Sequence, residues 1–148
     1  MLDYTIDRMQ EKDLEQVLEI EKLSFPTPWS RNSFLSELRE NEFAHYFVCR
    51  VDGRVMGYAG MWIILDEAHI TNVAVHPQYR GKGFGHLLLA ELMRQSLLRG
   101  SDRITLEVRK SNQAAQRVYE HMGFRATGVR KGYYTDTGED AIIMWKIL

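Results

Sequence analysis

Two hydrophobic periods alternate along the first forty residues and predict a strand followed by two helices. Residues 4–9, YTIDRM, alternate between apolar and polar side chains as a strand does. Asp13, with Gln16 three residues later, resembles the box that starts a helix. The apolar positions of this helix are Leu14, Val17, Leu18 and Leu23. The prolines of FPTPWS end it, and Ser30 can cap a second, short helix. The apolar positions of the second helix are Phe34, Leu35 and Leu38.

The next stretch reads as three strands in succession. Residues 44–51, AHYFVCRV, and residues 55–65, VMGYAGMWIIL, flank the turn pair Asp52-Gly53, which is typical of an antiparallel hairpin. A third strand, AHITNVAV at residues 68–75, follows Asp66-Glu67. Strands that follow one another without an intervening helix favour antiparallel pairing.

Helix and strand signals alternate in the second half of the chain. A helix is predicted from about Phe84 to Arg99, ended by Gly100, and RITLEV at residues 103–108 reads as a strand. Another helix is predicted from Asn112 to Met122, again closed by glycine. Residues 124–134 and 140–147, separated by TDTGE, form a closing hairpin. The class is therefore mixed α/β, of the α+β kind, with a largely antiparallel sheet.

Composition points to one domain and to no broad electrostatic partner. A length of 148 residues with 45% hydrophobic content suits a single domain over residues 1–148. The 19 basic and 20 acidic residues nearly cancel, so neither nucleic acid nor an anionic membrane is expected as partner. No apolar run of about 18 residues and no apolar signal core occur, so a cytoplasmic protein is expected. The lone Cys49 is expected to be a buried structural thiol rather than a nucleophile.

A glycine-rich loop, RGKGFG at residues 80–85, stands immediately before the best-marked helix. Glycines at 81, 83 and 85 let backbone amides approach a ligand without an intervening Cβ. The first turn of the helix that follows offers unpaired N–H groups and a positive dipole end, which favour a phosphate or pyrophosphate. Arg80, Lys82 and His86 add charge nearby. The alternative is a flexible connector, which requires fewer glycines.

Two common phosphate-binding motifs do not fit this loop. A Walker loop needs Gly-Lys followed by Ser or Thr, four residues after a first glycine, and that order is absent. A dinucleotide fingerprint needs a small residue three positions after Gly85, where Leu88 stands. The residues alone leave open which phosphate ligand binds.

The pattern Arg80-x-x-Gly83-x-Gly85 after NVAVHP resembles the acetyl-coenzyme A signature of the GNAT family of N-acetyltransferases, and the resemblance extends over nearly the whole chain. It is most similar to the RimI type, the protein N-terminal alanine acetyltransferases. That likeness is carried by FPTPWS at 25–30, LEVRKSNQAAQRVYEHMGF at 106–124 and YYTDTGEDAIIMW at 133–145. The resemblance implies a sheet of six to seven strands flanked by about four helices.

The resemblance also implies where acetyl-coenzyme A would lie. Backbone groups of Val73, Ala74 and Val75 would line the pantetheine arm. Arg80 would lie beside the pyrophosphate. The backbone amides that would wrap it belong to Gly81, Lys82, Gly83, Phe84, Gly85 and His86. Asn112 matches a family position that touches the cofactor through its side-chain amide, although a helix cap explains the same residue.

Acetyl transfer to an amine needs a base and benefits from an acid. An α-amino group has a pKa of about 8 and is mostly protonated at neutral pH. By resemblance, Glu107 is the general base and Tyr119, beside the cofactor sulfur, the general acid. Strand alternation places Glu107 opposite the apolar Leu106 and Val108. A solvated strand residue and a core tyrosine are the structural alternatives.

A second candidate base, Glu67, lies beside His69 at the start of the strand that leads to the glycine loop. His69, His76 and His86 are expected to be satisfied or solvated residues rather than ligands. No pair of them has metal-binding spacing, so no metal is expected.

Aromatic residues in the segments implied to flank the substrate are candidates for holding a peptide terminus, as the RimI resemblance suggests. They are Phe25, Trp29, Tyr133 and Tyr134. Simple loop anchoring explains them equally well. The two prolines stiffen residues 25–30, which suits one wall of a peptide slot.

The expected activity is therefore direct acetyl transfer to a protein N-terminal amine, that of an N-terminal alanine in a small-subunit ribosomal protein. One alternative is the same fold acting on a lysine side chain, a polyamine or an amino sugar. Another is a sensor that binds acetyl-coenzyme A without catalysis. The sequence leaves the oligomeric state open.

Overall fold

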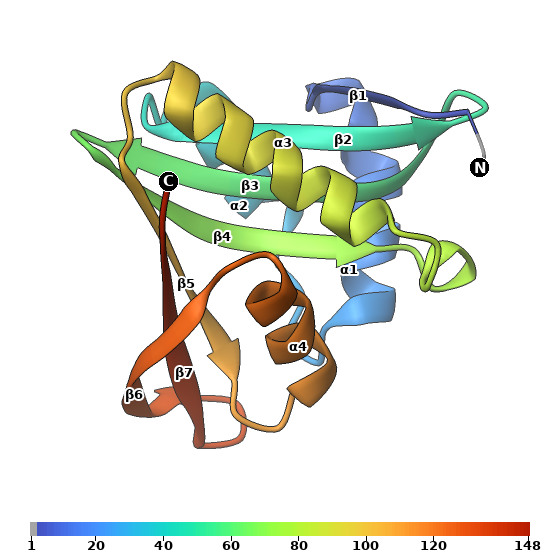
Figure 1. Ribbon diagram of the computed structural model, residues 1–148. Helices are drawn as coiled ribbons and strands as arrows, with labels where there is room; N and C mark the ends of the chain where they lie inside the picture. Colours follow the sequence, from blue (N-terminus) through green and yellow to red (C-terminus); the bar gives the residue numbers. More distant parts are fainter. Residues whose placement is uncertain (1–2) are drawn as a thin grey trace.

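The structure is a computed structural model that describes residues 3–148. It contains one seven-stranded sheet in the order β1-β2-β3-β4-β5-β7-β6, with four α-helices, as the sequence predicted (Figure 1). The strands are β1 (Thr5–Arg8), β2 (Ala44–Val51), β3 (Arg54–Ile64), β4 (Glu67–Val75), β5 (Arg103–Arg109), β6 (Arg125–Tyr134) and β7 (Glu139–Ile147). The helices are α1 (Leu14–Ser24), α2 (Arg31–Arg39), α3 (Phe84–Leu98) and α4 (Gln113–His121). Short 3₁₀ turns cover Glu11–Asp13 and Pro77–Tyr79.

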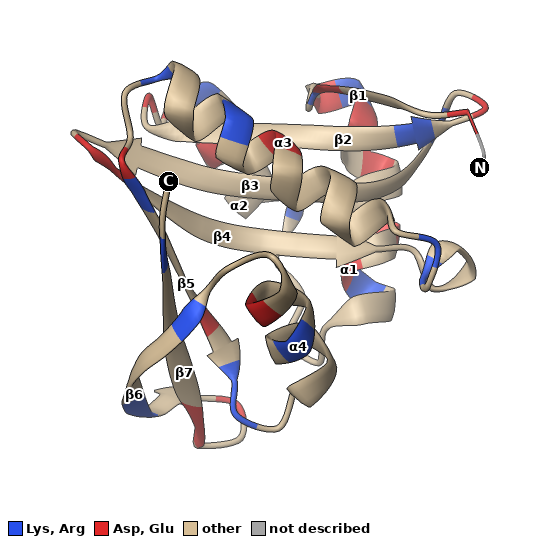
Figure 2. Cartoon of the chain, viewed as in Figure 1, with Lys and Arg blue, Asp and Glu red and all other residues tan. Residues whose placement is uncertain are grey.

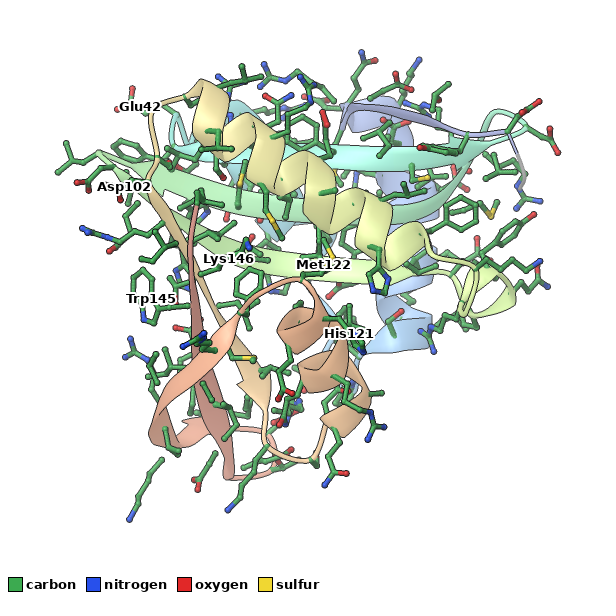
Figure 3. The ribbon with its side chains drawn as sticks, viewed as in Figure 1. Glu42, Asp102, His121, Met122, Trp145 and Lys146 are labelled. Carbon is green, nitrogen blue, oxygen red and sulfur yellow. The ribbon has the colours of Figure 1, made fainter. Side chains whose placement is uncertain are left out.

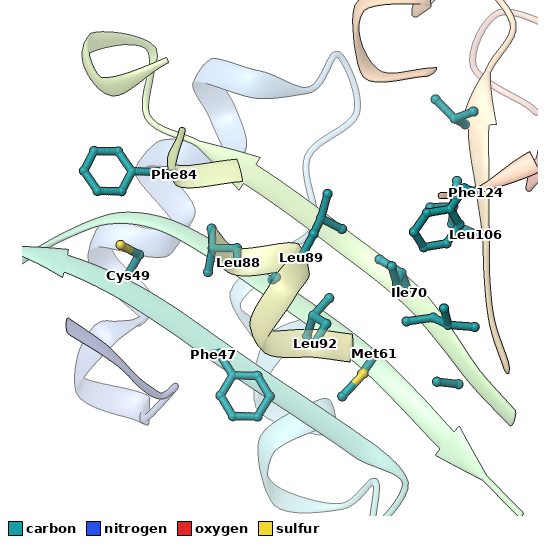
Figure 4. Packing of buried hydrophobic residues seen from close by; sticks show 14 of the residues in the cluster. Phe47, Cys49, Met61, Ile70, Phe84, Leu88, Leu89, Leu92, Leu106 and Phe124 are labelled. Atoms are coloured by element: carbon teal, nitrogen blue, oxygen red, sulfur yellow. The ribbon is translucent and has the colours of Figure 1, made fainter. Parts of the chain in front are cut away.

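Two apolar cores lie on opposite faces of the sheet. Helix α3 crosses one face, and α1 with α2 covers the other (Figure 1). Leu88, Leu89 and Leu92 of α3 are buried against β2 and β3 side chains such as Phe47 and Met61 (Figure 4). The helix is therefore held by an apolar stripe with the helical period.

Local signals in the sequence account for several turns and caps. Asp52 and Gly53 have φ of 52° and 77°, the pair of positive values that a tight β2–β3 hairpin turn requires. Ser30 accepts a hydrogen bond from the Ser33 N–H at 3.1 Å and caps α2 as predicted. Cys49 is buried, and burial raises the pKa of its thiol to about 11.

The predicted start of α1 was wrong in its capping pair. The Asp13 carboxylate accepts the Gln10 N–H at 2.9 Å and pairs with Arg50 at 2.7 Å, so the box lies one turn earlier. Gln16 instead accepts the Val55 N–H at 2.8 Å. Leu23 was also misplaced, because it is 52% exposed. At about 100° per residue it falls on the side opposite Leu14.

Glycine makes room for a cation at the end of α4. Gly123 has φ of 96°, and a Cβ at this position would collide with the Lys146 ammonium that reaches over from β7. Lys146 thus lies beside the C-terminal end of the helix, next to Met122 (Figure 3). A positive charge there complements the helix dipole.

A β-bulge reshapes β4 near its middle. Gly60 of β3 faces Asn72, whereas the next residue, Met61, faces Ile70, so Thr71 is the extra residue. The Tyr46 hydroxyl contacts Thr71 Oγ1 at 2.8 Å and donates to Asn72 Oδ1 at 3.1 Å. The Tyr46 ring lies directly over Gly60, where no side chain could fit. The bulge is therefore fixed by a buried tyrosine that needs a glycine beneath it.

Replacing this glycine should destabilise the fold. Gly60→Ala is expected to lower the free energy of unfolding by about 1–3 kcal/mol, because the new Cβ would overlap the buried ring of Tyr46. Denaturant unfolding of both chains measures the change. Gly128→Ala is the matched control, since its Cβ would meet only Ile143 Cδ1 at 3.8 Å. Equal stability of the two variants would contradict this account.

Candidate active site

The sheet opens between its two central parallel strands. β4 and β5 pair only at Glu67 with Arg103, Ala68 with Ile104 and His69 with Thr105, and then diverge (Figure 1). Beyond that point β4 remains paired with β3, and β5 with β7. We call the unpaired region beyond His69 and Thr105 the split. Backbone groups of the C-terminal half of β4 that face the split are free of β5, which suits an extended ligand.

The loop before α3 forms a glycine cradle at one end of β4. Gly81 and Gly83 have φ of 76° and 88°, and a Cβ at either position would face open space. Gly83 is the residue immediately before α3, so the first-turn N–H groups of the helix are exposed just beyond it. Basic residues lie in this loop (Figure 2). The cradle thus has the backbone geometry on which the prediction of an anion site rests.

The basic side chains of this loop have different roles. Arg80 donates from Nε to the Val75 carbonyl at 3.0 Å and from the guanidinium to Ser24 Oγ at 3.0 Å. It therefore ties the loop to the end of β4 and to α1. Lys82 Nζ lies 5.4 Å from the centre of the Tyr79 ring, and His86 is exposed on α3.

Glu107 lies on β5 at the split and is largely buried, with a side chain only 10% exposed. Its Oε2 contacts His69 Nε2 at 2.6 Å, and its Oε1 lies 3.6 Å from Arg130 Nε. Burial alone would raise the pKa of this carboxyl, but the His69 hydrogen bond and the charges of His69 and Arg130 outweigh it, so the pKa is lowered. Glu107 is thus held as an anion.

Tyr119 comes from α4 and from the other face of the sheet. Its ring packs against Phe124 at 5.8 Å, beside the apolar side chains of Leu106 and Val108. Burial raises the pKa of its phenol to about 12, so it remains protonated at neutral pH. Asn112 caps the same helix, because its Oδ1 accepts the Ala115 N–H at 3.1 Å.

Glu67 lies where the strands are still paired. Its carboxylate accepts a hydrogen bond from Arg103 Nε at 3.1 Å, and its side chain is 45% exposed. The paired position keeps it outside the split, unlike Glu107. Among residues 3–148, no group of three or more His, Cys, Asp or Glu side chains could hold a metal ion.

A hydrogen bond joins the proline-rich segment, residues 25–30, to the β6–β7 turn. Thr27 donates to Asp136 Oδ2 at 3.0 Å, and Arg109 pairs with the same carboxylate at 2.8 Å. The guanidinium of Arg109 stacks 4.0 Å from the centre of the Tyr134 ring. Tyr133 packs edge-on against Tyr134 at 5.1 Å. The two predicted aromatic pairs therefore stand on segments that one polar bridge connects.

Two buried carboxylates lie on α1 and α2, and sequence reasoning missed both. Glu21 accepts the Trp29 N–H at 2.8 Å and the Tyr58 hydroxyl. Glu37 accepts Trp62 Nε1 at 2.9 Å. Near them an open pocket of about 600 Å³ is lined by Trp29, Ser33, Ser36, Glu37, Glu40 and Asn41. An acidic residue on the apolar face of a predicted helix is the sequence signal from which Glu21 could have been identified.

Comparison with known proteins matches this geometry. The family model described as Acetyltransferase (GNAT) family covers residues 14–124, most of the chain. The chain belongs to the GNAT family. These acetyltransferases use acetyl-coenzyme A as the donor. The fold predicted from the glycine loop and the order of elements is therefore confirmed.

Relatives of this GNAT chain carry consistent names. It is 46% identical over 140 residues to a provisionally named [ribosomal protein bS18]-alanine N-acetyltransferase of Bacillus subtilis, covering 95% of this chain and 93% of the relative. It is 38% identical over 142 residues to the Escherichia coli K12 [ribosomal protein bS18]-alanine N-acetyltransferase, covering 95% of each. The crystal structure of the ribosomal-protein-S18-alanine N-acetyltransferase from Escherichia coli aligns with TM-score 0.89 and 37% identity, covering 98% of this chain and 94% of that one.

The environment of Glu107 can be tested directly by titration. The pKa of Glu107 should lie below that of a free glutamate and should rise in His69→Ala, because the favourable hydrogen bond and charge are lost. Carboxyl ¹³C chemical shifts against pH measure both values. In the wild type, stabilisation by ionised Glu107 should be present above the ordinary carboxyl pKa and be lost as pH falls through the lowered value. An unchanged pKa in the variant would contradict the assignment.

Proposed function

We propose that this protein transfers the acetyl group of acetyl-coenzyme A directly to the N-terminal α-amino group of a protein, the N-terminal alanine of ribosomal protein bS18. The observation that carries the proposal is the ionised Glu107 at the split, on the α1–α2 face that the predicted peptide-binding aromatics also flank. The names of the relatives support the same substrate.

The residues of the split fit acetyl-coenzyme A. The cradle of Gly81 and Gly83 gives a pyrophosphate access to backbone amides at the positive end of α3. The free edge of β4 at Val73, Ala74 and Val75 offers backbone groups to the pantetheine arm. Bound there, acetyl-coenzyme A supplies an activated thioester for attack by the amine.

Protein groups would manage the protons of the reaction. Glu107 accepts one proton from the substrate ammonium, directly or through a water molecule, and frees the lone pair that forms the new N–C bond. Strand amides near Val73 polarise the carbonyl. Tyr119 donates a proton to the sulfur as the C–S bond breaks, and it regains one from the amine nitrogen. The ammonium thus loses two protons, one to solvent and one to coenzyme A.

The peptide would lie on the α1–α2 face. Phe25 and Trp29 would form one wall and Tyr133 and Tyr134 the other, with the Thr27–Asp136 bridge joining the two segments. Tyr134 lies close enough to Glu107 for the two to interact electrostatically. Burial first, and then the charges of Tyr133 and Glu107, outweigh Arg109 and raise the pKa of Tyr134 to about 12. Such walls suit an extended chain end.

The test is coenzyme A release by the purified protein with short peptides. One peptide starts with a free alanine, and its control is N-terminally blocked but carries a free lysine. Turnover with the free terminus alone is the expected result. Turnover with the blocked peptide would move the activity to lysine, and binding of acetyl-coenzyme A without turnover would favour a sensor.

Removing the base or the acid should slow the chemical step. Glu107→Gln and Tyr119→Phe are each expected to lower kcat by about 10²–10⁴-fold, the usual contribution of a positioned acid or base. Rates at saturating substrates across pH provide the measurement. Glu67→Gln is the control and should keep wild-type kcat, because Glu67 is outside the split. A slow Glu67 variant with an active Glu107 variant would reverse the assignment.

Strain in the glycine cradle should weaken the binding of acetyl-coenzyme A rather than the binding of the peptide. Gly83→Ala forces a Cβ into φ of 88°, at a cost of about 1–2 kcal/mol. KM for acetyl-coenzyme A should rise by about five- to thirtyfold, while KM for the peptide stays constant. Gly100→Ala carries the same strain, at φ of 90°, at the far end of α3. If both variants raise this KM equally, the cradle is not the donor site.

A further inference from the structure

One buried glutamate of α1 holds the proline-rich segment near both of its ends. The backbone carbonyl of Glu21 accepts the Phe25 N–H at 3.0 Å, and its carboxylate Oε2 accepts the Trp29 N–H at 2.8 Å. Pro26 and Pro28, which lie between these two donors, have no N–H of their own. The segment therefore has few backbone donors with which to fold on itself, and a side chain of the preceding helix supplies an acceptor instead.

A closed circuit of contacts fixes the carboxylate and the Trp29 ring together. The Tyr58 hydroxyl donates to Glu21 Oε1. The Tyr58 ring packs edge-on against Phe34, with ring centres 5.9 Å apart, and the Phe34 ring lies 5.2 Å from that of Trp29. Glu21, Phe34 and Tyr58 are each 1% exposed or less. The position of Trp29 is thus determined by one buried hydrogen-bond acceptor and one buried aromatic contact.

The buried charge of Glu21 has no counter-ion. Burial raises the pKa of its carboxyl, although the hydrogen bonds from Trp29 and Tyr58 oppose this. In residues 3–148 no cation pairs with it, whereas the equally buried Asp13 pairs with Arg50 at 2.7 Å. An apolar side chain would fill the same space without the cost of removing a carboxyl group from water. The hydrogen bond to Trp29, rather than packing, therefore accounts for an acid at this position.

We propose that Glu21 is a positioning residue for the substrate peptide, because the reach of its side chain holds in place the wall formed by Phe25 and Trp29. The inference rests on the proposed function, in which these two residues line the peptide. Thr27, between them, donates to Asp136 of the β6–β7 turn at 3.0 Å. Glu21 ties the wall to α1 and Asp136 ties it to the opposite wall, so the two contacts set the width of the slot.

A wall held in this way acts on the binding of the peptide. A segment that is already ordered loses little conformational freedom when a peptide packs against it. Trp29 also lines the open pocket of about 600 Å³ beside α2, so its movement would change the space open to peptide side chains. The donor loop is held separately, because Arg80 bonds to Ser24 Oγ and to the Val75 carbonyl.

Reach and charge can be separated at this position. Glu21→Gln keeps the length of the side chain and an acceptor oxygen for the Trp29 N–H, whereas Glu21→Asp keeps the charge but is one methylene shorter. We expect Glu21→Asp to raise KM for the peptide by about tenfold and Glu21→Gln to stay within about twofold of the wild type. In both variants kcat and KM for acetyl-coenzyme A should be unchanged. Hydrogen exchange of the Trp29 amide should be faster in Glu21→Asp alone.

Asp13→Asn is the matched control, because it removes the charge of another buried carboxylate beside the same helix. It should lower the thermal unfolding temperature and leave KM for the peptide unchanged. If Glu21→Asp does not fold, Tyr58→Phe decides by the same measurements, since it removes the hydroxyl that holds the carboxylate.

The wild type is assayed first, and whichever amine it acetylates is used for the comparison. Absence of turnover on every amine would overturn the proposed function and this inference together. With an active wild type, an unchanged peptide KM in Glu21→Asp would overturn the inference alone. An equal rise in Asp13→Asn would do the same, because general destabilisation would then explain it. Equal losses in Glu21→Gln and Glu21→Asp would also overturn it, because reach would not matter.

Discussion

The loss of pairing between β4 and β5 after three residue pairs is the constraint on which the rest of the structure depends. Each strand keeps one partner along its length, β3 for β4 and β7 for β5, so the sheet remains continuous while its middle opens. An open edge of this kind normally invites aggregation. Here a ligand with its own hydrogen-bonding groups would occupy the edge, as we propose for acetyl-coenzyme A.

The bulge at Thr71 helps to hold the sheet in this arrangement. An extra residue bends a strand and increases its twist, and Thr71 is placed just beyond the last residue paired with β5. Buried polar groups then fix the bend, because Tyr46 contacts both Thr71 and Asn72 and needs Gly60 beneath its ring. Such a network is stabilising only when its members are satisfied. The geometry of the candidate site therefore depends on residues that lie outside the predicted site.

Sequence reasoning succeeded where the signal is local. The turn at Asp52-Gly53, the Ser30 cap and the glycine cradle each follow from the conformation that a few adjacent residues favour. It failed for contacts that depend on register between distant segments. The expectation that His69 is satisfied or solvated is confirmed, but its partner Glu107 could not be named, because nothing in one sequence shows that β4 and β5 pair so as to bring the two together. The tie from Arg80 to Ser24 depends on tertiary packing in the same way.

The opening also explains how the proposed acid and the proposed base, on opposite faces of one sheet, could serve one reaction. Glu107 projects toward the α1–α2 face, while Tyr119 packs with Leu106 and Val108 on the α3 side. In a continuous sheet the backbone would separate two such groups. Where β4 and β5 diverge no ladder stands between them, so a thioester lying in the split could face both. Peptide and donor would then approach from different faces, and the amine would meet the carbonyl only within the split.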